Sequence, residues 1–407
     1  MALLKDQYDK VLLEDVAPNI HDIIREKMFF GNYVVDAPSG VKFKGNTTEV
    51  RMKTQYEHSY QPAKEMETIP KPGTPDWIKF LLTVRKCVGT LAFSQEAVEH
   101  TAGDSYQVGA LKSGLETFMK TMRLTKELLI ASDGTGAILG GDCTGPAVGQ
   151  NIPVTHSFFI RRGMRVMAVD GSDNVVAPEL FVTKENPDTH DVTVTGDVSG
   201  IDGTCQLYLF GGYSPAHDKS PMGFDIHLSD TNGEHALYQG FDRSTDYILS
   251  GRNLYGSVKG TPENISEARV YDLFALFRDV DRDEKRSGIC NDGVAKHLLA
   301  YRATKNQPTV RFDQEIGDKK GIRIIHNGET IEIEVHPVIP QNQLWAIHKG
   351  SNVWYRGKAG FYNPSGAKEI FRAFTDQLGM YAVWADFWNI VSLDPMLSGK
   401  MHDITEA

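Results

Sequence analysis

The sequence lacks the features that mark membrane and secreted proteins. No apolar run approaches the roughly 20 residues that a membrane-spanning helix needs. The N-terminal stretch MALLKDQYDKVLLEDVAPN places acidic residues inside its apolar part and has no cleavage signature, so it is not typical of a signal peptide. We therefore expect no membrane partner.

Cysteine is scarce, and its spacing excludes the common metal and redox motifs. The four cysteines are Cys87, Cys143, Cys205 and Cys290, and no two form a C-x-x-C pair. A zinc knuckle or a redox motif needs such local spacing. The pattern predicts four reduced thiols in a protein made in a cytoplasm.

Positive charge is also in deficit, since 43 basic residues face 53 acidic ones and the formal net charge is -10. This balance argues against a basic protein that wraps a DNA duplex, although a local basic patch is still compatible with it. Hydrophobic residues make up 41% and charged residues 24%, which is typical of a globular chain. A length of 407 residues allows two or three domains.

The glycine-rich segment DGTGAILGGDCTG (133–145) is not a phosphate loop. It contains no lysine for a Walker motif, and it follows the end of an expected helix instead of opening one. A helix C-terminus carries partial negative charge, which repels phosphate. We expect a turn here.

The acidic run RDVDRDEKR (278–286) resembles the start of a calcium loop only in part. Asp279, Asp281 and Asp283 alternate, but Glu284 stands where the loop needs glycine and Cys290 where it needs glutamate. The run predicts a solvated charged turn.

Histidines do not form a recognisable metal or catalytic motif. His217, His227 and His235 lie near Asp225 in the sequence, but their spacing fits no zinc pair, so we expect surface or loop histidines. No G-x-S-x-G elbow is present, and 53 acids are too many for spacing to nominate a catalytic pair. The sequence predicts no catalytic, cofactor or metal site, and no enzyme.

What the sequence does contain is one long amphipathic helix, expected over 104–133. Asp104 and Gln107 have capping-box spacing, and Gly134 follows the last apolar residues as a left-handed cap would. Its apolar residues recur at three- and four-residue intervals on one stripe: Val108, Leu111, Leu115, Phe118, Met122 and Leu129. No residue of this helix is typical of catalysis.

A long hairpin precedes this helix. The segment 47–61 is expected to run out as a strand, 63–77 forms a tip with three prolines and a glycine, and 78–94 returns. A two-stranded hairpin is only marginally stable alone, so we expect it to lie against its own chain or another subunit.

The remaining pattern is rich in strands. Strands are expected in 154–171 and 189–212, a hairpin around Asn327-Gly328 in 321–337, and one long strand over 379–396. Helices are expected over 261–281, with Thr261 as N-cap and Pro262 at the first position, and over 294–304 and 367–377.

Aromatic residues are concentrated near the C-terminus, at Tyr381, Trp384, Phe387 and Trp388. They could form a ligand platform, but we expect them to pack under the long helix because such side chains bury large apolar areas.

The order of these parts resembles the major capsid protein of tailed bacteriophages, the Hong Kong 97-type capsid fold. The segments that carry the resemblance are LAFSQEAVEHT before the helix, ELLIASDGTGAIL at its end and GMYAVWADFWNIVSLDPMLSGKMHDI near the C-terminus. The resemblance implies an α+β fold with an N-terminal arm, an extended loop, a peripheral domain with a long spine helix and an axial domain.

The resemblance also implies a division of the chain into segments. These are an N-terminal arm (1–46), the extended loop (47–94), the peripheral domain with its spine helix (95–153), a candidate inserted β-subdomain (154–212), a β-rich return to the peripheral domain (213–260), the axial domain (261–351) and a C-terminal helix and strand of the peripheral domain (352–407).

The implied function is structural. The chain would assemble with itself into hexamers and pentamers of an icosahedral phage head, with a separate scaffolding protein, a portal and weakly bound double-stranded DNA as partners. It would be made in the host cytoplasm and reside in the virion. Two alternatives are an encapsulin-like compartment shell and a β-rich carbohydrate-binding protein or hydrolase.

Overall fold

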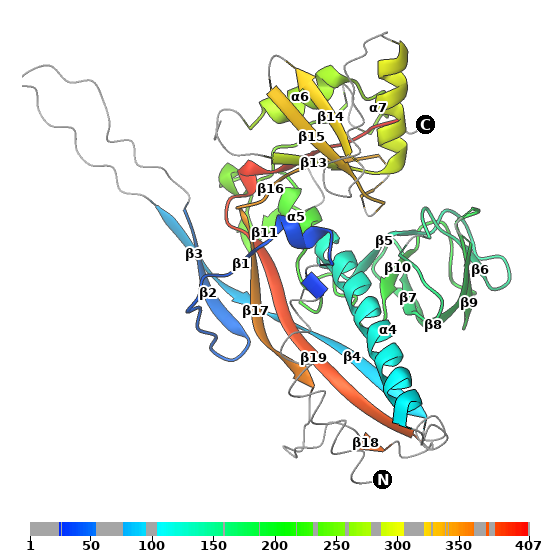
Figure 1. Cartoon of the computed structure of the whole chain (residues 1–407). Helices are drawn as coiled ribbons and strands as arrows, with labels where there is room; N and C mark the ends of the chain where they lie inside the picture. Colours follow the sequence, from blue (N-terminus) through cyan, green and yellow to red (C-terminus); the bar gives the residue numbers. More distant parts are fainter. Residues whose placement is uncertain are drawn as a thin grey trace, which may run out of the picture. The chain divides into compact units, whose positions relative to one another are not determined.

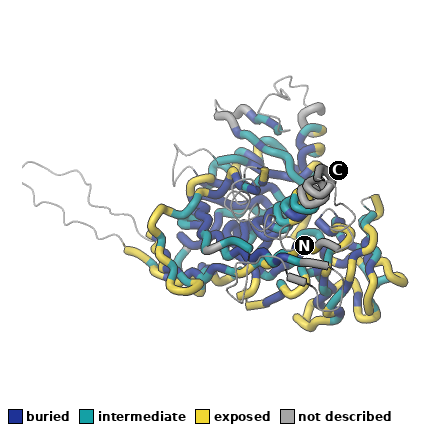
Figure 2. Tube along the Cα trace, turned by 60° about the horizontal axis from the view of Figure 1, so that its bottom comes forward, coloured by how far each residue is buried: buried dark blue, intermediate teal, exposed yellow. Residues whose placement is uncertain are grey.

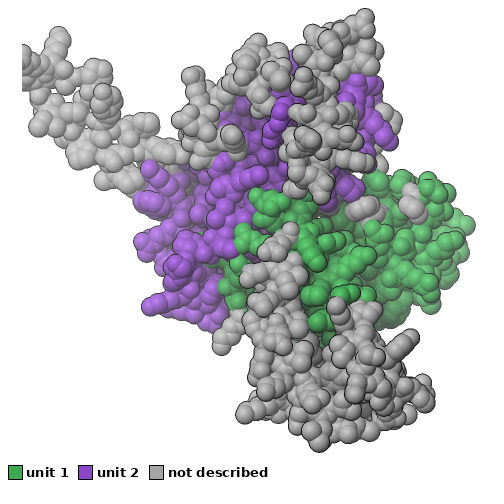
Figure 3. Space-filling view, viewed as in Figure 1, with its two compact units in different colours: residues 1–32, 84–222, 355–389 green, residues 33–83, 223–354, 390–407 purple. Residues whose placement is uncertain are grey.

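The computed structural model divides the chain into two compact units (Figure 3). The first comprises residues 1–32, 84–222 and 355–389, and the second comprises 33–83, 223–354 and 390–407. Both contain helices and strands, so the expected α+β class is correct. The structure describes residues 24–25, 27–53, 76–94, 104–157, 159–186, 188–216, 218–230, 235–256, 260–277, 286–304, 321–326, 329–337, 339–340, 342–361, 372–373 and 379–405.

The long helix of the first unit is α4 (Asp104–Ala131), which has 28 residues and lies along β4 and β19 (Figure 1). It ends two residues earlier than the expected 104–133, and Gly134 follows in the left-handed conformation with φ +90°, as expected. Phe118 and Leu129 are buried, whereas Leu115 and Met122 are only partly buried. The side chains of Asp104, Gln107, Val108 and Leu111 lie outside the described residues.

A long antiparallel strand pair supports this helix. β19 (Gly379–Ser392) pairs with β4 (Arg85–Ser94) from Gly379↔Ser94 to Trp388↔Arg85. Its tryptophans Trp384 and Trp388 are 1% and 0% exposed, which excludes a surface platform at these residues and agrees with the expected packing role.

The same sheet also contains β17 (Asn352–Phe361), β1 (Val35–Asp36) and β18 (Arg372–Ala373). The expected helix over 367–377 is wrong at β18, because Arg372 and Ala373 pair with Tyr381 and Met380 of β19. The free edge of a long strand overrides local helix preference there. The other residues of that range lie outside the described ones.

Six strands of the first unit form a closed antiparallel barrel: β5 (Ala137–Asp142), β10 (Gln206–Leu209), β7 (Arg165–Val169), β8 (Val175–Asn186), β9 (Asp191–Thr195) and β6 (Asn151–Pro153), in this order. A bridge between Cys143 and Val154 joins the first strand to the last, and Thr155 N–H donates to the Asp142 carbonyl at 2.9 Å. The barrel overlaps the segment 154–212 and begins earlier, at Ala137, because β5 and β6 are needed to close the ring. The assignment of 154–212 as an inserted β-subdomain stays a prediction.

In the second unit, β2 (Thr47–Lys53) and β3 (Trp77–Thr83) form the expected hairpin, paired from Thr47↔Thr83 to Lys53↔Trp77. The tip between them lies outside the described residues apart from Asp76. The expected single return strand over 78–94 is wrong. It divides at Val84 because β2 is fully paired by β3, and the following β4 finds a longer partner in β19.

The second unit also contains a five-stranded sheet in the order β14 (Gly321–His326), β15 (Glu329–Val335), β13 (Arg286–Cys290), β16 (Leu344–His348) and β20 (Gly399–Met401). β14 and β15 pair as the predicted hairpin, although its turn Asn327-Gly328 is not among the described residues. α7 (Asp292–Thr304) agrees with the helix expected over 294–304.

The other helix of this sheet, α6 (Glu267–Ala275), starts later than predicted. Ser266 is its N-cap and accepts from Arg269 N–H at 3.3 Å, so Thr261 and Pro262 are not in the helix. Thr261 and Pro262 stay outside the helix because the segment that follows them is bound to the C-terminal segment: Glu263 N–H donates to the Asp403 carbonyl at 2.7 Å.

The sheet and its two helices share one apolar core, which includes Val270, Leu298 and Ile333. Met401 and Ile404 belong to this core as well. The last residues of the chain therefore pack in the core of this sheet. The division into an axial domain (261–351) and a C-terminal peripheral part (352–407) stays a prediction. Buried residues are dark blue in Figure 2.

Short elements connect these parts: η2 (Phe30–Tyr33), α5 (Phe224–Leu228), β11 (Leu237–Tyr238), β12 (Phe241–Asp242), η3 (Tyr247–Leu249) and η4 (Pro395–Leu397). The long C-terminal strand ends at Ser392, before the expected stop at Pro395, which opens η4.

Candidate functional site

The singled-out histidines lie in different surroundings. His217 and the acidic residues Asp279, Asp281 and Asp283 fall outside the described residues. His227 lies in α5 and is 1% exposed, so the expectation of a surface histidine is wrong for it. Burial, and then the charge of Arg243, lower the pKa of His227 to about 3, which keeps its imidazole neutral near pH 7.

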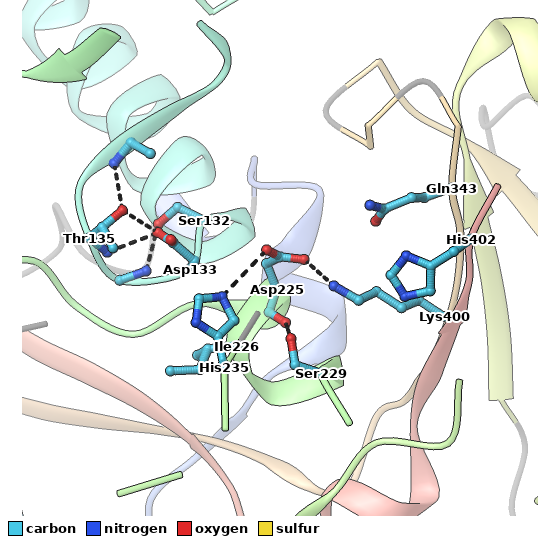
Figure 4. Close-up of polar contacts among 12 residues, drawn as sticks. Ser132, Asp133, Thr135, Asp225, Ile226, Ser229, His235, Gln343, Lys400 and His402 are labelled. Atoms are coloured by element: carbon cyan, nitrogen blue, oxygen red, sulfur yellow. Dashed lines mark hydrogen bonds and ion pairs between the residues drawn. The ribbon is translucent and has the colours of Figure 1, made fainter. Parts of the chain in front are cut away.

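Asp225 and Lys400 form a largely buried ion pair in the second unit, with side chains 18% and 7% exposed (Figure 4). Lys400 Nζ donates to Asp225 Oδ1 at 2.6 Å, and His235 Nε2 lies 4.0 Å from the other carboxylate oxygen. Burial opposes ionisation of Asp225, but the charge and hydrogen bond of Lys400 outweigh it and lower its pKa below the usual range. The pair fastens β20 to α5.

His402 continues this polar cluster. Its ring stacks on Tyr255 with centroids 4.7 Å apart, and the Tyr255 hydroxyl donates to Asp230 Oδ1 at 2.9 Å. Burial and then Lys400 lower the pKa of His402 to about 4. The structure thus brings together Asp225 and His235, which the sequence singled out, with Lys400 and His402, which no local spacing could have linked to them.

Arg243 is another residue that the sequence did not indicate. It is 0% exposed, and its guanidinium donates to the carbonyls of Ile226, Ser229 and Leu249. Burial lowers its pKa to about 10, so it is charged at neutral pH. A buried cation that donates to three backbone carbonyls around a short helix organises the local fold.

The DGTG segment is a turn, as predicted. Asp133 Oδ1 accepts from Thr135 N–H at 2.9 Å and from Thr135 Oγ1 at 2.6 Å (Figure 4). Gly136 has φ +87°, and a Cβ there would lie 2.6 Å from the Gly212 carbonyl oxygen. Only glycine fits this position, which connects α4 to the first barrel strand.

The long helix is not free of charged contacts, contrary to the impression its sequence gives. Lys126 forms an ion pair with Asp386 of β19, with side chains 5% and 2% exposed. Glu127 Oε1 accepts from Phe29 N–H at 3.0 Å. These polar contacts tie α4 to segments that are remote in sequence.

A cavity of about 540 Å³ lies beside this ion pair. Its walls come from α4, β4 and β19, and they include Thr117, Thr121 and Thr125 on the helix. Phe118 can approach β4 closely because Gly89 has no side chain: a Cβ there would lie 2.8 Å from the Phe118 ring.

The β2–β3 hairpin has two unlike faces. Val50, Met52, Phe80 and Leu82 alternate on its buried face. On the other face Trp77 is 50% exposed and Leu81 is 72% exposed. This outer face is the candidate functional surface, because large apolar side chains stay in contact with water there.

The described residues contain neither a candidate metal-binding group nor a candidate membrane-spanning helix. Within the described ranges, no group of three or more His, Cys, Asp and Glu residues could hold a metal ion. Among the same residues, no helix has the length and apolar character to cross a membrane.

No family model matches the chain, and no curated protein matches it. Among solved structures it is similar to a cyanophage A-1(L) capsid protein, with 11% identity, a TM-score of 0.49 and coverage of 92% of this chain and 91% of that chain. The capsid of the native GTA particle has 11% identity, a TM-score of 0.44 and coverage of 92% and 97%. An encapsulin of Synechococcus elongatus has 5% identity, a TM-score of 0.40 and coverage of 91% and 85%.

These neighbours agree in kind with the resemblance that the sequence shows to phage capsid proteins. Their TM-scores are below 0.5, so the function proposed below rests on the elements of this chain.

Proposed function

We propose that this chain is the major shell protein of a tailed-phage head, which assembles into hexamers and pentamers around double-stranded DNA. In this assignment α4 is the spine helix of the peripheral domain, the β2–β3 hairpin belongs to the extended loop, and the sheet with α6 and α7 is the axial domain. The role of the protein is structural, and its working parts are surfaces.

The outer face of the hairpin carries this proposal. Trp77 and Leu81 expose apolar area on a two-stranded sheet that has only one buried face. Burying such side chains on a neighbouring copy would be favourable by at most about 1.5–3 kcal/mol for each, since Trp77 and Leu81 are already partly covered. Glu49 and Arg51 pair with each other on the same face at 3.0 Å, and the exposed Lys53 and Lys79 leave the charge beside the apolar residues net positive.

The interior of the first unit supports the same role. A 28-residue helix, tied by the Lys126–Asp386 pair to a strand of 14 residues, is a stiff element. A subunit of this kind holds its edges in place while neighbouring copies bind them, and it needs no catalytic group to do so. The partners proposed are further copies of the chain, a separate scaffolding protein, a portal and DNA bound weakly and without sequence preference.

Electron microscopy of the purified chain tests the proposal. Closed shells, or hexameric and pentameric rings, are the expected result. Leu81→Lys and Trp77→Ser should leave a folded subunit that no longer forms them. A monodisperse monomer from the unmodified chain, or normal shells from the double variant, would contradict the assignment.

Val148→Lys is the matched control. Val148 is 74% exposed, as Leu81 is 72% exposed, but it lies in the connection between β5 and β6 and not on the hairpin. The same change of charge at a comparably exposed apolar residue should therefore leave assembly intact. Shells that carry protein cargo and no DNA when produced in the natural host would favour an encapsulin-like compartment instead.

A further inference from the structure

Two of the four free cysteines face each other across neighbouring strands of the barrel. Cys143 directly follows β5, and Cys205 directly precedes β10. Gln206 is paired with Asp142, so the next residues in this antiparallel register, Cys205 and Cys143, stand directly opposite. Cys143 N–H donates to the Cys205 carbonyl at 2.8 Å.

Both side chains occupy the same face of these strands. Cys143 is 4% exposed and Cys205 is 2% exposed, and Leu207, two residues further along, is fully buried. Side chains two residues apart in a strand share a face, so Cys205 points into the barrel with Leu207. Asp142 and Gln206, the intervening pair, are not buried.

This arrangement matches the backbone geometry that a disulfide requires. Directly opposed, hydrogen-bonded residues of an antiparallel pair have Cα atoms about 5.5 Å apart. Disulfides span Cα separations of about 4.4–6.8 Å. The pair makes one backbone hydrogen bond, since Cys205 N–H donates to the Asp202 carbonyl at 3.3 Å. To form the disulfide, the Cys205 side chain must rotate away from Asp202 Oδ1 and the Gly200 carbonyl, which its Sγ contacts at 3.4 and 3.8 Å.

We propose that Cys143 and Cys205 are a disulfide-forming pair that closes a covalent loop around the barrel once the protein leaves reducing surroundings. The proposal rests on the proposed function only for the moment at which oxidation occurs, since a phage head passes from a reducing cytoplasm to an oxidising exterior. The pairing itself depends on the register of β5 and β10 alone.

The chemistry is thiol–disulfide exchange with a small disulfide such as oxidised glutathione. One protein thiol loses its proton and attacks a sulfur of the reagent, which releases one glutathione thiol and leaves a mixed disulfide. The second protein thiol then loses its proton and attacks the protein-bound sulfur, which releases the other glutathione thiol. Two protein thiols are oxidised, and one disulfide is reduced to two thiols.

Exchange at this pair should be slow. Burial raises the pKa of Cys143 to about 12 and also raises that of Cys205, and only the thiolate reacts. Slow reaction suits a bond that forms after folding and assembly, because the thiols stay reduced while the chain is made.

Peptide mapping tests the pair directly. The purified full-length chain is incubated with oxidised glutathione at about pH 8.5, because the thiolate fraction rises with pH. It is then alkylated and digested with trypsin without reductant. The expected product joins peptides 127–161 and 185–219 with the loss of two hydrogens, and free thiols fall from the four of the reduced chain to two. Four remaining thiols, or glutathione retained on Cys143 or Cys205, would overturn the proposal.

Matched variants separate this pair from the other cysteines. Cys143→Ser and Cys205→Ser should each abolish the linked peptide, and a Cys87→Ser, Cys290→Ser double variant should retain it. If a barrel variant fails to fold, the mapping of the unmodified chain still decides the question.

The linked barrel should also melt higher, by on the order of 10 °C, because the closed loop restricts the unfolded chain. A linked product with an unchanged melting temperature would refute the stabilising role. All of these measurements use unassembled chain, so their failure is distinct from a failure to form shells.

Discussion

Replacing Asp386 by asparagine should loosen the long helix from its sheet more than any surface charge replacement. Lys126 and Asp386 form an ion pair whose side chains are 5% and 2% exposed. Asp386→Asn keeps the size of the side chain but removes the negative charge. The ammonium group of Lys126 then stays in a site with little access to water and no countercharge from residue 386.

The expected cost follows from that burial. Removing one partner of a buried ion pair typically costs about 3–5 kcal/mol, because the remaining charge is no longer compensated. Replacing both partners by apolar residues of similar size often costs far less. Lys126→Met combined with Asp386→Leu should therefore restore most of the stability that either single replacement removes.

Hydrogen exchange followed by mass spectrometry measures the effect where it arises. Peptides that cover the C-terminal half of α4 and the middle of β19 should exchange about two to three and a half orders of magnitude faster in Asp386→Asn, since about 1.4 kcal/mol corresponds to a factor of ten. The double replacement should bring the rates back toward those of the unmodified chain.

An exposed ion pair in the same unit provides the control. Arg165 and Glu179 pair on the barrel with side chains 47% and 37% exposed, so Glu179→Gln should cost no more than about 1 kcal/mol. Equal effects of Asp386→Asn and Glu179→Gln would refute the reasoning, because burial would then not decide the strength of the two pairs.

Three further predictions follow from single buried contacts. Gly89→Ala should destabilise the first unit by about 1–3 kcal/mol in urea denaturation, because its Cβ would lie 2.8 Å from the Phe118 ring. Arg243→Met should cost at least about 3 kcal/mol in the same assay, since three buried carbonyls lose a charged donor; a cost below about 1 kcal/mol would show that water replaces it. The folded chain keeps His227 neutral down to about pH 3, whereas the unfolded imidazole binds a proton below about pH 6.5. The unfolded state therefore binds more protons in this window, so the free energy of unfolding should fall by up to about 1.4 kcal/mol per pH unit on acidification; in His227→Phe this slope should be smaller.

Several elements could be predicted from the sequence because local pattern determined them. α4 combines apolar spacing with a terminal glycine, and the β14–β15 hairpin alternates on both sides of Asn327-Gly328. In both cases local preference and tertiary packing agree, so a single sequence is sufficient.

The errors arose where pairing with a remote segment decided the structure. The apolar run 78–94 looks like one strand in the sequence, but it forms two strands separated at Val84. The residues after Val84 pair with β19, nearly 300 residues away. The helix expected at Thr261 was shortened for the same reason, since Glu263 pairs with the C-terminal segment. Local secondary-structure propensity contains no information about which remote segment a strand will pair with.

Most of the buried polar residues were also beyond prediction. Nothing near Lys126 or Lys400 distinguishes it from an exposed lysine, because each carboxylate partner lies far along the chain. The facing cysteines show the same limit: Cys143 and Cys205 looked scattered until the strand register placed them opposite each other.

The two ion pairs and the exposed hairpin face have different roles: the polar contacts fix strand register, and the apolar face is available for contact with other copies. Lys126–Asp386 and Lys400–Asp225 each join segments that are remote in sequence. A one-residue slip of β19 or β20 would turn the charged side chain to the other face of its sheet and leave its partner buried alone. Buried charge therefore penalises wrong registers within each unit. Apolar contact tolerates small shifts, and under the proposed shell function the outer face with Trp77 and Leu81 would depend on it. A shell whose subunits meet in slightly different local environments needs this combination of fixed registers inside and adaptable apolar contact between copies.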